Sequence, residues 1–422
     1  MKTASNSTDG ARRAGTRSRS LAIPVIAVLL GILLAEFSLK LAAFAVPAVA
    51  SLLSEASGQT IPDPLLGYRG NPKWYDHDER GYRNEHALTK ADIVVLGDSH
   101  AYGAGVSANQ AWPYSLGRDT GFATYNMAFG GYGTAHSLLQ LEEAIELAPR
   151  LVILAVYFGN DFADNFWVAM RNERIKSFLS REAPSELARL DRLESLEARV
   201  ARVSVMRKSR GKKSPSALKS FLSDYSALYS LGRVLQNHLS SAWRGRDPML
   251  ADDFDKAVRN LTDRDLQYCS VFEDRGWRTI LTGPYRGLVN DRDDMRIQAG
   301  YDLTSRILLE IRERLDTNKI RLLVVLLPTK ESVFASRVSN IEAHVGLAKL
   351  VTDERENREG LIRFMELQDI HYLDTLPFLQ RSASQPYFHS ANGHPNALGH
   401  EIIAREVGYA ARGVLASPSS QR

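Results

Sequence analysis

Short apolar runs alternate with longer amphipathic segments along most of the chain. The runs 151–156 and 322–327 are apolar at every position, which is typical of strands buried on both faces. We expect strands at 93–96, 124–126, 151–156, 322–327 and 371–373, and helices near 110–118, 135–147, 299–315, 355–367 and 397–415. This alternation predicts an α/β domain of three layers, in which helices cover both faces of a mainly parallel sheet.

The alternation is interrupted between about residues 162 and 275. This segment has leucine and valine at helical spacing from 187 to 203, after Pro184 and Ser185, so we expect a helical insertion. It also carries a basic run, residues 202–213, without any acidic residue. Two interpretations stay open: a helical cap with a solvated loop, or a lid that contacts membrane phosphates or an anionic polymer.

The N-terminus has the pattern of a membrane anchor. Five basic residues in the tail 1–20 precede the apolar stretch 21–53, which only Glu36 and Lys40 interrupt. Because basic flanks stay in the cytoplasm, we expect a single-pass signal anchor in a bacterial inner membrane, with the main body in the periplasm. Cleavage after the Ala-Val-Ala at 48–50, or a buried soluble helix, are the alternatives.

After the anchor, residues 54–90 are rich in proline and glycine and predict an extended lead-in to a domain at 91–418. The 422-residue chain has 44% apolar and 24% charged residues, which is ordinary for a globular protein. Its single cysteine, Cys269, excludes an intrachain disulfide and a CxxC-type zinc or redox site. The net charge of +4 gives no reason to expect nucleic-acid binding.

Candidate chemistry follows the strands, because active sites of parallel sheets gather at the carboxyl ends of the strands. Ser99, in Gly97-Asp98-Ser99-His100, follows the first strand. A serine at the start of a helix lies near free backbone N–H groups that stabilise negative charge, so it is a candidate nucleophile. The alternative is an ordinary helix cap.

Three further residues stand at comparable positions. Gly131 lies in a glycine-rich segment after the second strand, and Asn160 follows the third, so a backbone N–H and a side-chain amide are available to an oxyanion. A tight turn and a capping asparagine are the alternatives. His394 precedes the last helix and is a candidate general base, whereas His400 is expected to pack or cap.

Together, the order and spacing of these blocks resemble the SGNH (GDSL-type) hydrolase superfamily. The resemblance implies a flavodoxin-like α/β/α fold, with Ser99 as nucleophile and His394 as base. It also implies an oxyanion hole from the Ser99 N–H, the Gly131 N–H and the Asn160 side chain, with no metal or other cofactor. Anchored bacterial members associated with cell-envelope polysaccharides share the Gly67-Tyr68-Arg69 lead-in and a strand ending like 327–331.

The sequence departs from the family at the acid of the triad. The usual aspartate lies two or three residues before the histidine, where this chain has Asn392 and Ala391. Three outcomes stay open: Asn392 or a backbone carbonyl orients His394, Asp374 approaches from elsewhere, or the site is degenerate.

The resemblance implies an extracytoplasmic serine esterase or O-acyltransferase that acts on O-acyl groups, such as acetyl, of an envelope glycan or exopolysaccharide. The expected partners are an acylated saccharide or other ester, the membrane and polysaccharide-assembly proteins, but no nucleic acid. The alternatives are a non-catalytic carbohydrate-binding or assembly protein and a lipid esterase.

Overall fold

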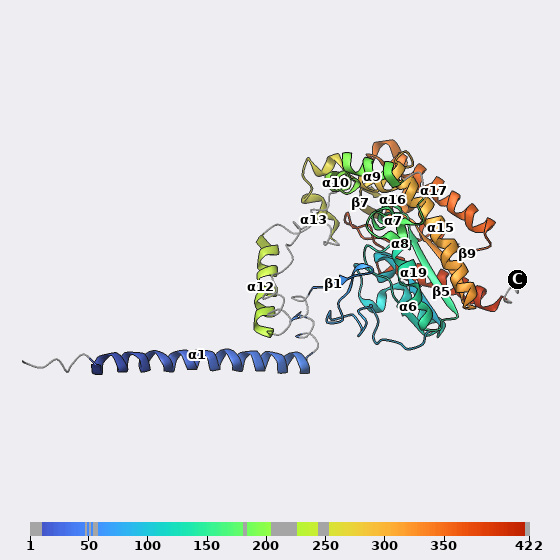
Figure 1. The fold of residues 1–422 in the computed structure, drawn as a ribbon. Helices are drawn as coiled ribbons and strands as arrows, with labels where there is room; N and C mark the ends of the chain where they lie inside the picture. The colour runs from blue at the N-terminus through green and yellow to red at the C-terminus, as the bar shows by residue number, and fades with distance from the viewer. Residues whose placement is uncertain are drawn as a thin grey trace, which may run out of the picture. The chain divides into compact units, whose positions relative to one another are not determined.

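The computed structural model describes residues 11–46, 49, 52–53, 58–179, 184–203, 226–243 and 253–417 (Figure 1). The chain divides into two compact units. One comprises Met1–Gln59, Lys73–Tyr75 and Lys212–Arg244, and the other comprises Thr60–Pro72, Asp76–Gly211 and Gly245–Arg422.

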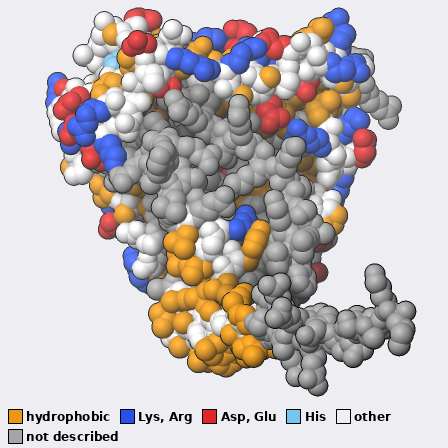
Figure 2. All heavy atoms as spheres, turned by 90° about the vertical axis from the view of Figure 1, so that its left-hand side faces the viewer, with side chains coloured by type: hydrophobic (Ala, Val, Ile, Leu, Met, Phe, Trp, Pro, Cys, Tyr) orange, Lys and Arg blue, Asp and Glu red, His pale blue; other side chains and the backbone are white. Residues whose placement is uncertain are grey.

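The smaller unit contains the long helix α1 (Ala11–Ala45) and α12 (Ala227–Trp243). The stretch Ile23–Ala45 of α1 has a mean hydropathy of 2.2, and its side chains form a nearly continuous apolar surface (Figure 2). A helix of this length spans about 35 Å, which is enough to cross the hydrocarbon core of a bilayer. The expected N-terminal apolar helix is therefore present, and it fits either a membrane anchor or a signal sequence.

The larger unit is built on a five-stranded sheet in which all neighbouring strands are parallel. Its strands are β3 (Ile93–Leu96), β4 (Thr124–Asn126), β5 (Leu151–Tyr157), β8 (Arg321–Leu327) and β9 (His371–Asp374). The spatial order is β4-β3-β5-β8-β9, the flavodoxin-like order, which reverses direction between β3 and β5. Ligands of such sheets bind at the carboxyl ends of the strands beside this reversal.

Helices cover both faces of the sheet. On one face α4 (Trp112–Thr120) packs against α19 (Ala397–Ala416), and on the other α15 (Met295–Thr317) packs against α5 (Thr134–Leu139) and α7 (Asp161–Ala169). Every residue of β3 and β5 is buried, as their uninterrupted apolar sequences predict. The three-layer α/β/α architecture expected from the sequence is thus confirmed.

Further helices complete the larger unit. They are α3 (Ser99–Tyr102), α6 (Leu141–Glu146), α8 (Glu173–Lys176), α9 (Pro184–Leu193), α10 (Leu196–Val203), α13 (Phe254–Arg259), α14 (Gly283–Asn290), α16 (Lys330–Ala335), α17 (Leu347–Leu367) and α18 (Leu376–Gln380). The expected insertion, about 162–275, is mainly helical where the structure describes it, but it ends in the strand β6 (Ser270–Asp274). Residues 204–213 of its basic run lie outside the described residues.

The structure differs from the sequence-based expectation in several elements. The helix expected near 355–367 begins eight residues earlier, at Leu347. The helix expected over 135–147 is divided into α5 and α6 at Gln140. The lead-in contains an antiparallel hairpin of β1 (Thr60–Asp63) and β2 (Gly67–Gly70). A second hairpin, β6 (Ser270–Asp274) with β7 (Trp277–Leu281), was not predicted, because β6 is short and polar and its turn lacks an Asn-Gly or Asp-Gly pair.

Candidate active site

Ser99 is the first residue of α3, at the carboxyl end of β3. Gly97 lets the chain pass close to β5: its φ is +154°, and a Cβ there would lie 2.9 Å from the Cβ of Ala155. Ser99 is partly exposed, whereas its neighbours Asp98 and His100 are buried. Since α3 has only four residues, the helix-end stabilisation of charge expected from the sequence is small.

The structure brings Ser99 and His394 together. The Nε2 atom of His394 lies 2.8 Å from Ser99 Oγ, and its Nδ1 atom lies 2.6 Å from the Oδ1 atom of Asn392. The His394 backbone N–H also donates to this Oδ1, at 3.0 Å, so the atom is an acceptor and the ring Nδ1 carries the proton. His394 Nε2 is then unprotonated and accepts the Ser99 hydroxyl proton, as a general base requires.

His394 stays neutral in this environment. Burial lowers its pKa well below the usual 6.5, and the neighbouring His100, Arg286, His400 and Lys330 lower it further. A carboxylate at position 392 would act in the opposite direction, because it stabilises the imidazolium ion. The site therefore holds a base that gains a proton only at acidic pH.

The glycine-rich segment after β4 passes beside Ser99. A Cβ on Gly130 would lie 3.8 Å from the Ser99 Cβ, and the Tyr68 hydroxyl donates to the Gly130 carbonyl at 2.8 Å. Gly131 is exposed and has a φ of +79°, which a glycine adopts without strain. Tyr68 thus anchors the segment that carries the predicted oxyanion donor, and the role of the Gly131 N–H stays a prediction.

Asn160 follows β5 and occupies the N-cap position of α7, but its side chain makes no capping hydrogen bond. Instead its Nδ2 donates to Oδ2 of Asp164 one turn along the helix. An amide nitrogen has two N–H groups, so one is left for a ligand. Because Asn160 is partly exposed, its predicted oxyanion role is compatible with this geometry.

Three buried carboxyl groups lie near these residues: Asp98, Asp161 and Asp164. Burial and the charge of Asp98 raise the pKa of Asp164 to about 7, although the hydrogen bond from the Asn160 amide opposes this shift. Burial and the charge of Asp98 also raise the pKa of Asp161. Within the described residues, no group of three or more His, Cys, Asp or Glu side chains is arranged to hold a metal ion.

The other candidates of the sequence have structural partners. Asp374 accepts from Arg358 Nη1 at 2.9 Å and from the Leu376 N–H, so it pairs with Arg358, while Asn392 occupies the acid position next to His394. His400 is buried, and its Nδ1 accepts the backbone N–H of Trp112 at 3.3 Å. Its expected packing role is therefore confirmed.

Sequence reasoning missed two buried cations behind the His394 loop, Arg286 and Lys330. Lys330 Nζ lies within hydrogen-bond distance of the Ile280, Ser390 and Asn392 carbonyls and the Thr279 hydroxyl, at 2.8–3.2 Å. Burial lowers its pKa to about 8. The 327–331 motif marks Lys330 in the sequence, but nothing in the sequence marks Arg286.

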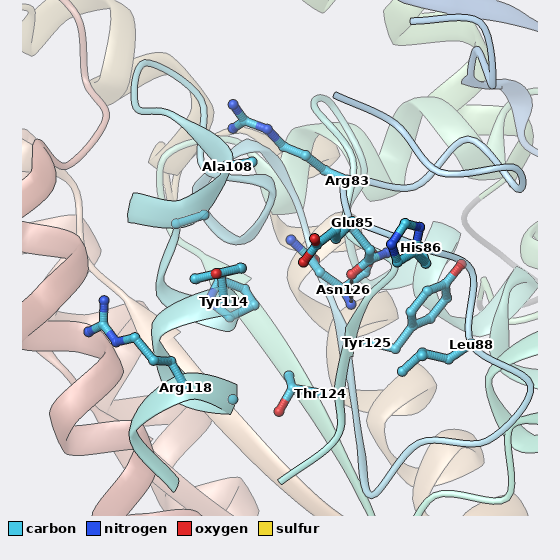
Figure 3. Close-up of a pocket in the computed structure, with 14 residues that line it drawn as sticks. Arg83, Glu85, His86, Leu88, Ala108, Tyr114, Arg118, Thr124, Tyr125 and Asn126 are labelled. Carbon is cyan, nitrogen blue, oxygen red and sulfur yellow. Dashed lines mark hydrogen bonds between the residues drawn. The ribbon is translucent and has the colours of Figure 1, made fainter. Parts of the chain in front are cut away.

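A separate hollow of about 460 Å³ lies beside α4. Figure 3 shows Tyr114 and Arg118 of α4 on one side, and Glu85 and His86 of the lead-in on the other. Its lining does not include Ser99, Gly131, Asn160, Asn392 or His394. The candidate site therefore rests on side-chain geometry at the strand ends rather than on this hollow.

No family model and no curated protein matches the chain. Solved structures that it resembles include a putative lipolytic protein of the G-D-S-L family from Desulfitobacterium hafniense, at 12% identity over 76% of this chain and 99% of that one (TM-score 0.32). An extracellular lipase from Streptomyces rimosus matches at 12% identity over 78% and 100% of the two chains (TM-score 0.36).

A salicylyl-acyltransferase from a tetracycline biosynthetic pathway matches at 14% identity over 80% of this chain and 59% of that one (TM-score 0.28). The solved structures that the chain resembles thus include lipolytic hydrolases, one of them of the G-D-S-L family, and an acyltransferase.

Proposed function

We propose that the protein is a serine esterase or O-acyltransferase that uses Ser99 as nucleophile and His394 as base. The observation that carries the proposal is the hydrogen-bonded chain from Asn392 through His394 to Ser99, with both links at 2.8 Å or less. A serine hydroxyl is a weak nucleophile without such a base, and this arrangement supplies one.

The proposed reaction has two steps. Ser99 Oγ attacks the ester carbonyl while its proton moves to His394 Nε2, and the oxyanion is stabilised by the Ser99 N–H, the Gly131 N–H and the Asn160 amide. The carbon–oxygen bond to the leaving alcohol then breaks, and His394 returns the proton to that alcohol. Water or a sugar hydroxyl then attacks the carbonyl carbon of the acyl-serine and loses its proton to His394 Nε2. The bond from that carbon to Ser99 Oγ breaks, Ser99 recovers the proton from His394, and the acid or a new ester is released.

We further propose that the domain acts outside the cytoplasm on O-acyl groups of an envelope glycan or exopolysaccharide. The basic tail ahead of the apolar helix Ile23–Ala45 supports the orientation, and the resemblance to polysaccharide-associated members supports the substrate. A lipid ester is the second candidate, because an anchor of this kind keeps a site near the bilayer.

The alternative from another class is a non-catalytic glycan-binding or assembly protein. The absence of a carboxylate next to His394 favours it, since losing that acid costs roughly 10⁴-fold in a serine protease. The 2.8 Å contact between His394 and Ser99 opposes it, because a binding protein has no need of an oriented base.

The test uses the full chain in detergent with a fluorophosphonate probe, which labels activated serines. We expect labelling of the wild type, no labelling of Ser99→Ala, and wild-type labelling of Ser305→Ala, a partly buried serine of α15. Equal labelling of wild type and Ser99→Ala would overturn the enzyme proposal.

Substrate class is tested on O-acetylated polysaccharide and on phospholipid vesicles. Release or transfer of acetate that depends on Ser99 supports the glycan proposal, whereas fatty-acid release alone supports the lipid alternative. Orientation is tested by adding protease to intact spheroplasts: degradation of the domain supports a periplasmic location, and protection contradicts it.

A further inference from the structure

Arg286 lies in α14 and is buried, with 6% of its surface exposed. Its Nη1 donates to the Gly159 carbonyl at 2.7 Å. Its guanidinium carbon lies 5.4 Å from the ring centre of Tyr157 and 4.8 Å from that of Tyr285, within the range of cation–π attraction. The side chain is therefore held by one carbonyl and two aromatic rings.

This cation lacks a direct counter-ion. Within the described residues, the guanidinium forms no ion pair with any carboxylate, and its buried Nε has no hydrogen-bond partner. Asp98 and Glu331 attract it only from a distance. Because an unpaired buried charge costs several kcal/mol, packing alone would favour an apolar side chain at this position.

Arg286 touches the two segments that must cooperate in the proposed reaction. Gly159, whose carbonyl it binds, directly precedes Asn160. On the other side, a Cβ on Gly393 would lie 2.4 Å from Arg286 Nη2, so the guanidinium lies against the residue that directly precedes His394. The guanidinium therefore contacts both the Asn160 turn and the His394 loop.

Stacked rings also connect Arg286 with His394. Tyr157, beneath the guanidinium, stacks on His100 with ring centres 3.6 Å apart, and His100 lies 4.8 Å from His394. His100 in turn contacts the Gly393 carbonyl through Nε2 at 3.3 Å. The position of the His394 ring thus depends on a packed series that begins at Arg286.

We propose that Arg286 is a positioning residue of the Ser99 site, which fixes the Asn160 turn against the His394 loop and supplies a permanent positive charge beside them. This inference rests on the proposed function and assigns a role to a residue outside the four sequence blocks. The charge disfavours a protonated His394 and favours an oxyanion formed near Asn160.

Other charged or titratable groups also act on His394 or on Arg286. His100 of α3, Lys330 of α16 and His400 of α19 act on His394. Asp98, Tyr157 of β5, Tyr285 of α14 and Glu331 of α16 act on Arg286. Lys330 has a pKa of about 8 and His400 one of about 3, so neither keeps a full positive charge at every pH of interest. Arg286 is the group among them whose charge does not titrate.

The experiment compares Arg286→Gln, Arg286→Lys and Gly393→Ala in the full chain in detergent. The rate of fluorophosphonate labelling of Ser99 is measured from pH 4 to pH 9, together with kcat and KM on an aryl ester. Arg296→Gln is the matched control, because Arg296 is equally buried but pairs with Asp294 at the start of α15, outside the site.

We expect Arg286→Gln to lower kcat roughly 10- to 100-fold with little change in KM, since a misplaced group costs this much. The acid limb of its labelling profile moves to higher pH, because removing a positive neighbour raises the pKa of His394. We expect Arg286→Lys to keep the acid limb of the wild type, because lysine keeps the positive charge, but to lower kcat, because lysine lacks the planar guanidinium. We expect Gly393→Ala alone to lower kcat. In the double variant with Arg286→Gln it lowers kcat little further, because both substitutions act through the guanidinium.

An Arg286→Gln protein with the melting temperature, kcat and acid limb of the wild type would overturn the inference. If Arg286→Gln does not fold, an unchanged kcat in both Arg286→Lys and Gly393→Ala overturns it. If the wild type shows no Ser99 labelling, the proposed function fails. In that case the His394 ring is titrated by its ¹⁵N chemical shifts in the wild type, in Arg286→Lys and in Arg286→Gln. A His394 pKa in Arg286→Gln that equals the wild-type pKa refutes the electrostatic role of Arg286.

Discussion

The Oδ1 atom of Asn392 lies 2.6 Å from Nδ1 of His394, at the position where a serine triad has a carboxylate oxygen. The same oxygen accepts the His394 backbone N–H at 3.0 Å, so the loop itself fixes the amide. Asn392 therefore orients the ring as an aspartate does, but without the negative charge that stabilises an imidazolium ion. Of the three outcomes left open by the sequence, the geometry supports orientation by Asn392.

Substitution of Asn392 separates orientation from charge. Asn392→Ala removes the acceptor, and we expect labelling of Ser99 to fall by up to roughly 10⁴-fold, the loss found when the acid of a serine triad is replaced. Asn392→Asp keeps the acceptor and adds a charge, so we expect faster labelling at pH 8 and an acid limb at higher pH than in the wild type. The rate is measured across pH for both variants.

Equal rates for wild type and Asn392→Ala would show that the amide does not orient His394. A loss in Asn392→Ala without any gain in Asn392→Asp would show that the charge is not limiting.

The pH dependence of the wild type follows from His394. Its pKa is lowered well below 6.5, so the base stays unprotonated and Ser99 stays reactive as the pH falls through 6.5. We expect the acid limb of kcat/KM for an aryl ester to lie below pH 6.5, in contrast to a site with a carboxylate-paired histidine. A limb at or above neutral pH would contradict the environment described for His394.

Asp164 makes stability depend on pH. Its pKa of about 7 in the folded protein exceeds the usual 3.8, so the folded state keeps a proton that the unfolded state has lost. The proton retained by Asp164 stabilises the folded state fully below pH 3.8, and this stabilisation is lost as the pH rises to about 7. We therefore expect Asp164→Asn to gain melting temperature relative to wild type between pH 4 and pH 8.

The exposed Asp263 provides the control, because Asp263→Asn leaves the melting curve of the wild type unchanged across this range. A constant difference between Asp164→Asn and wild type at all pH values would refute the raised pKa of Asp164.

Lys330→Met tests the support of the His394 loop. The substitution leaves the buried Ile280 and Ser390 carbonyls without this donor, which costs about 1–3 kcal/mol each. We expect the free energy of unfolding to fall by roughly 2–4 kcal/mol and Ser99 labelling to decrease. Lys90→Met, at an exposed lysine, is the control and changes stability by less than about 0.5 kcal/mol. Equal effects of the two substitutions would contradict the proposed support.

Much of the fold follows from local sequence. The strands at 93–96 and 124–126 have the expected bounds, and those near 151–156 and 322–327 differ by one residue. Three of these four sequences are uninterrupted apolar runs, which is typical of buried parallel strands, whereas 124–126 is Thr-Tyr-Asn. The β6–β7 hairpin escaped prediction, because its residues do not alternate clearly and pair only in the folded chain.

The sequence by itself determined the three-layer α/β class, the apolar N-terminal helix, the strand-end placement of Ser99, Gly131 and Asn160, and the position of His394 before the last helix. Periodicity and motif spacing are local properties, and strand ends of a parallel sheet share one edge. Only the tertiary structure decided that Asn392 rather than Asp374 accompanies His394, and that Arg286 lies between Gly159 and Gly393. These contacts join residues of separate elements, and their distances follow from packing, which no local pattern encodes.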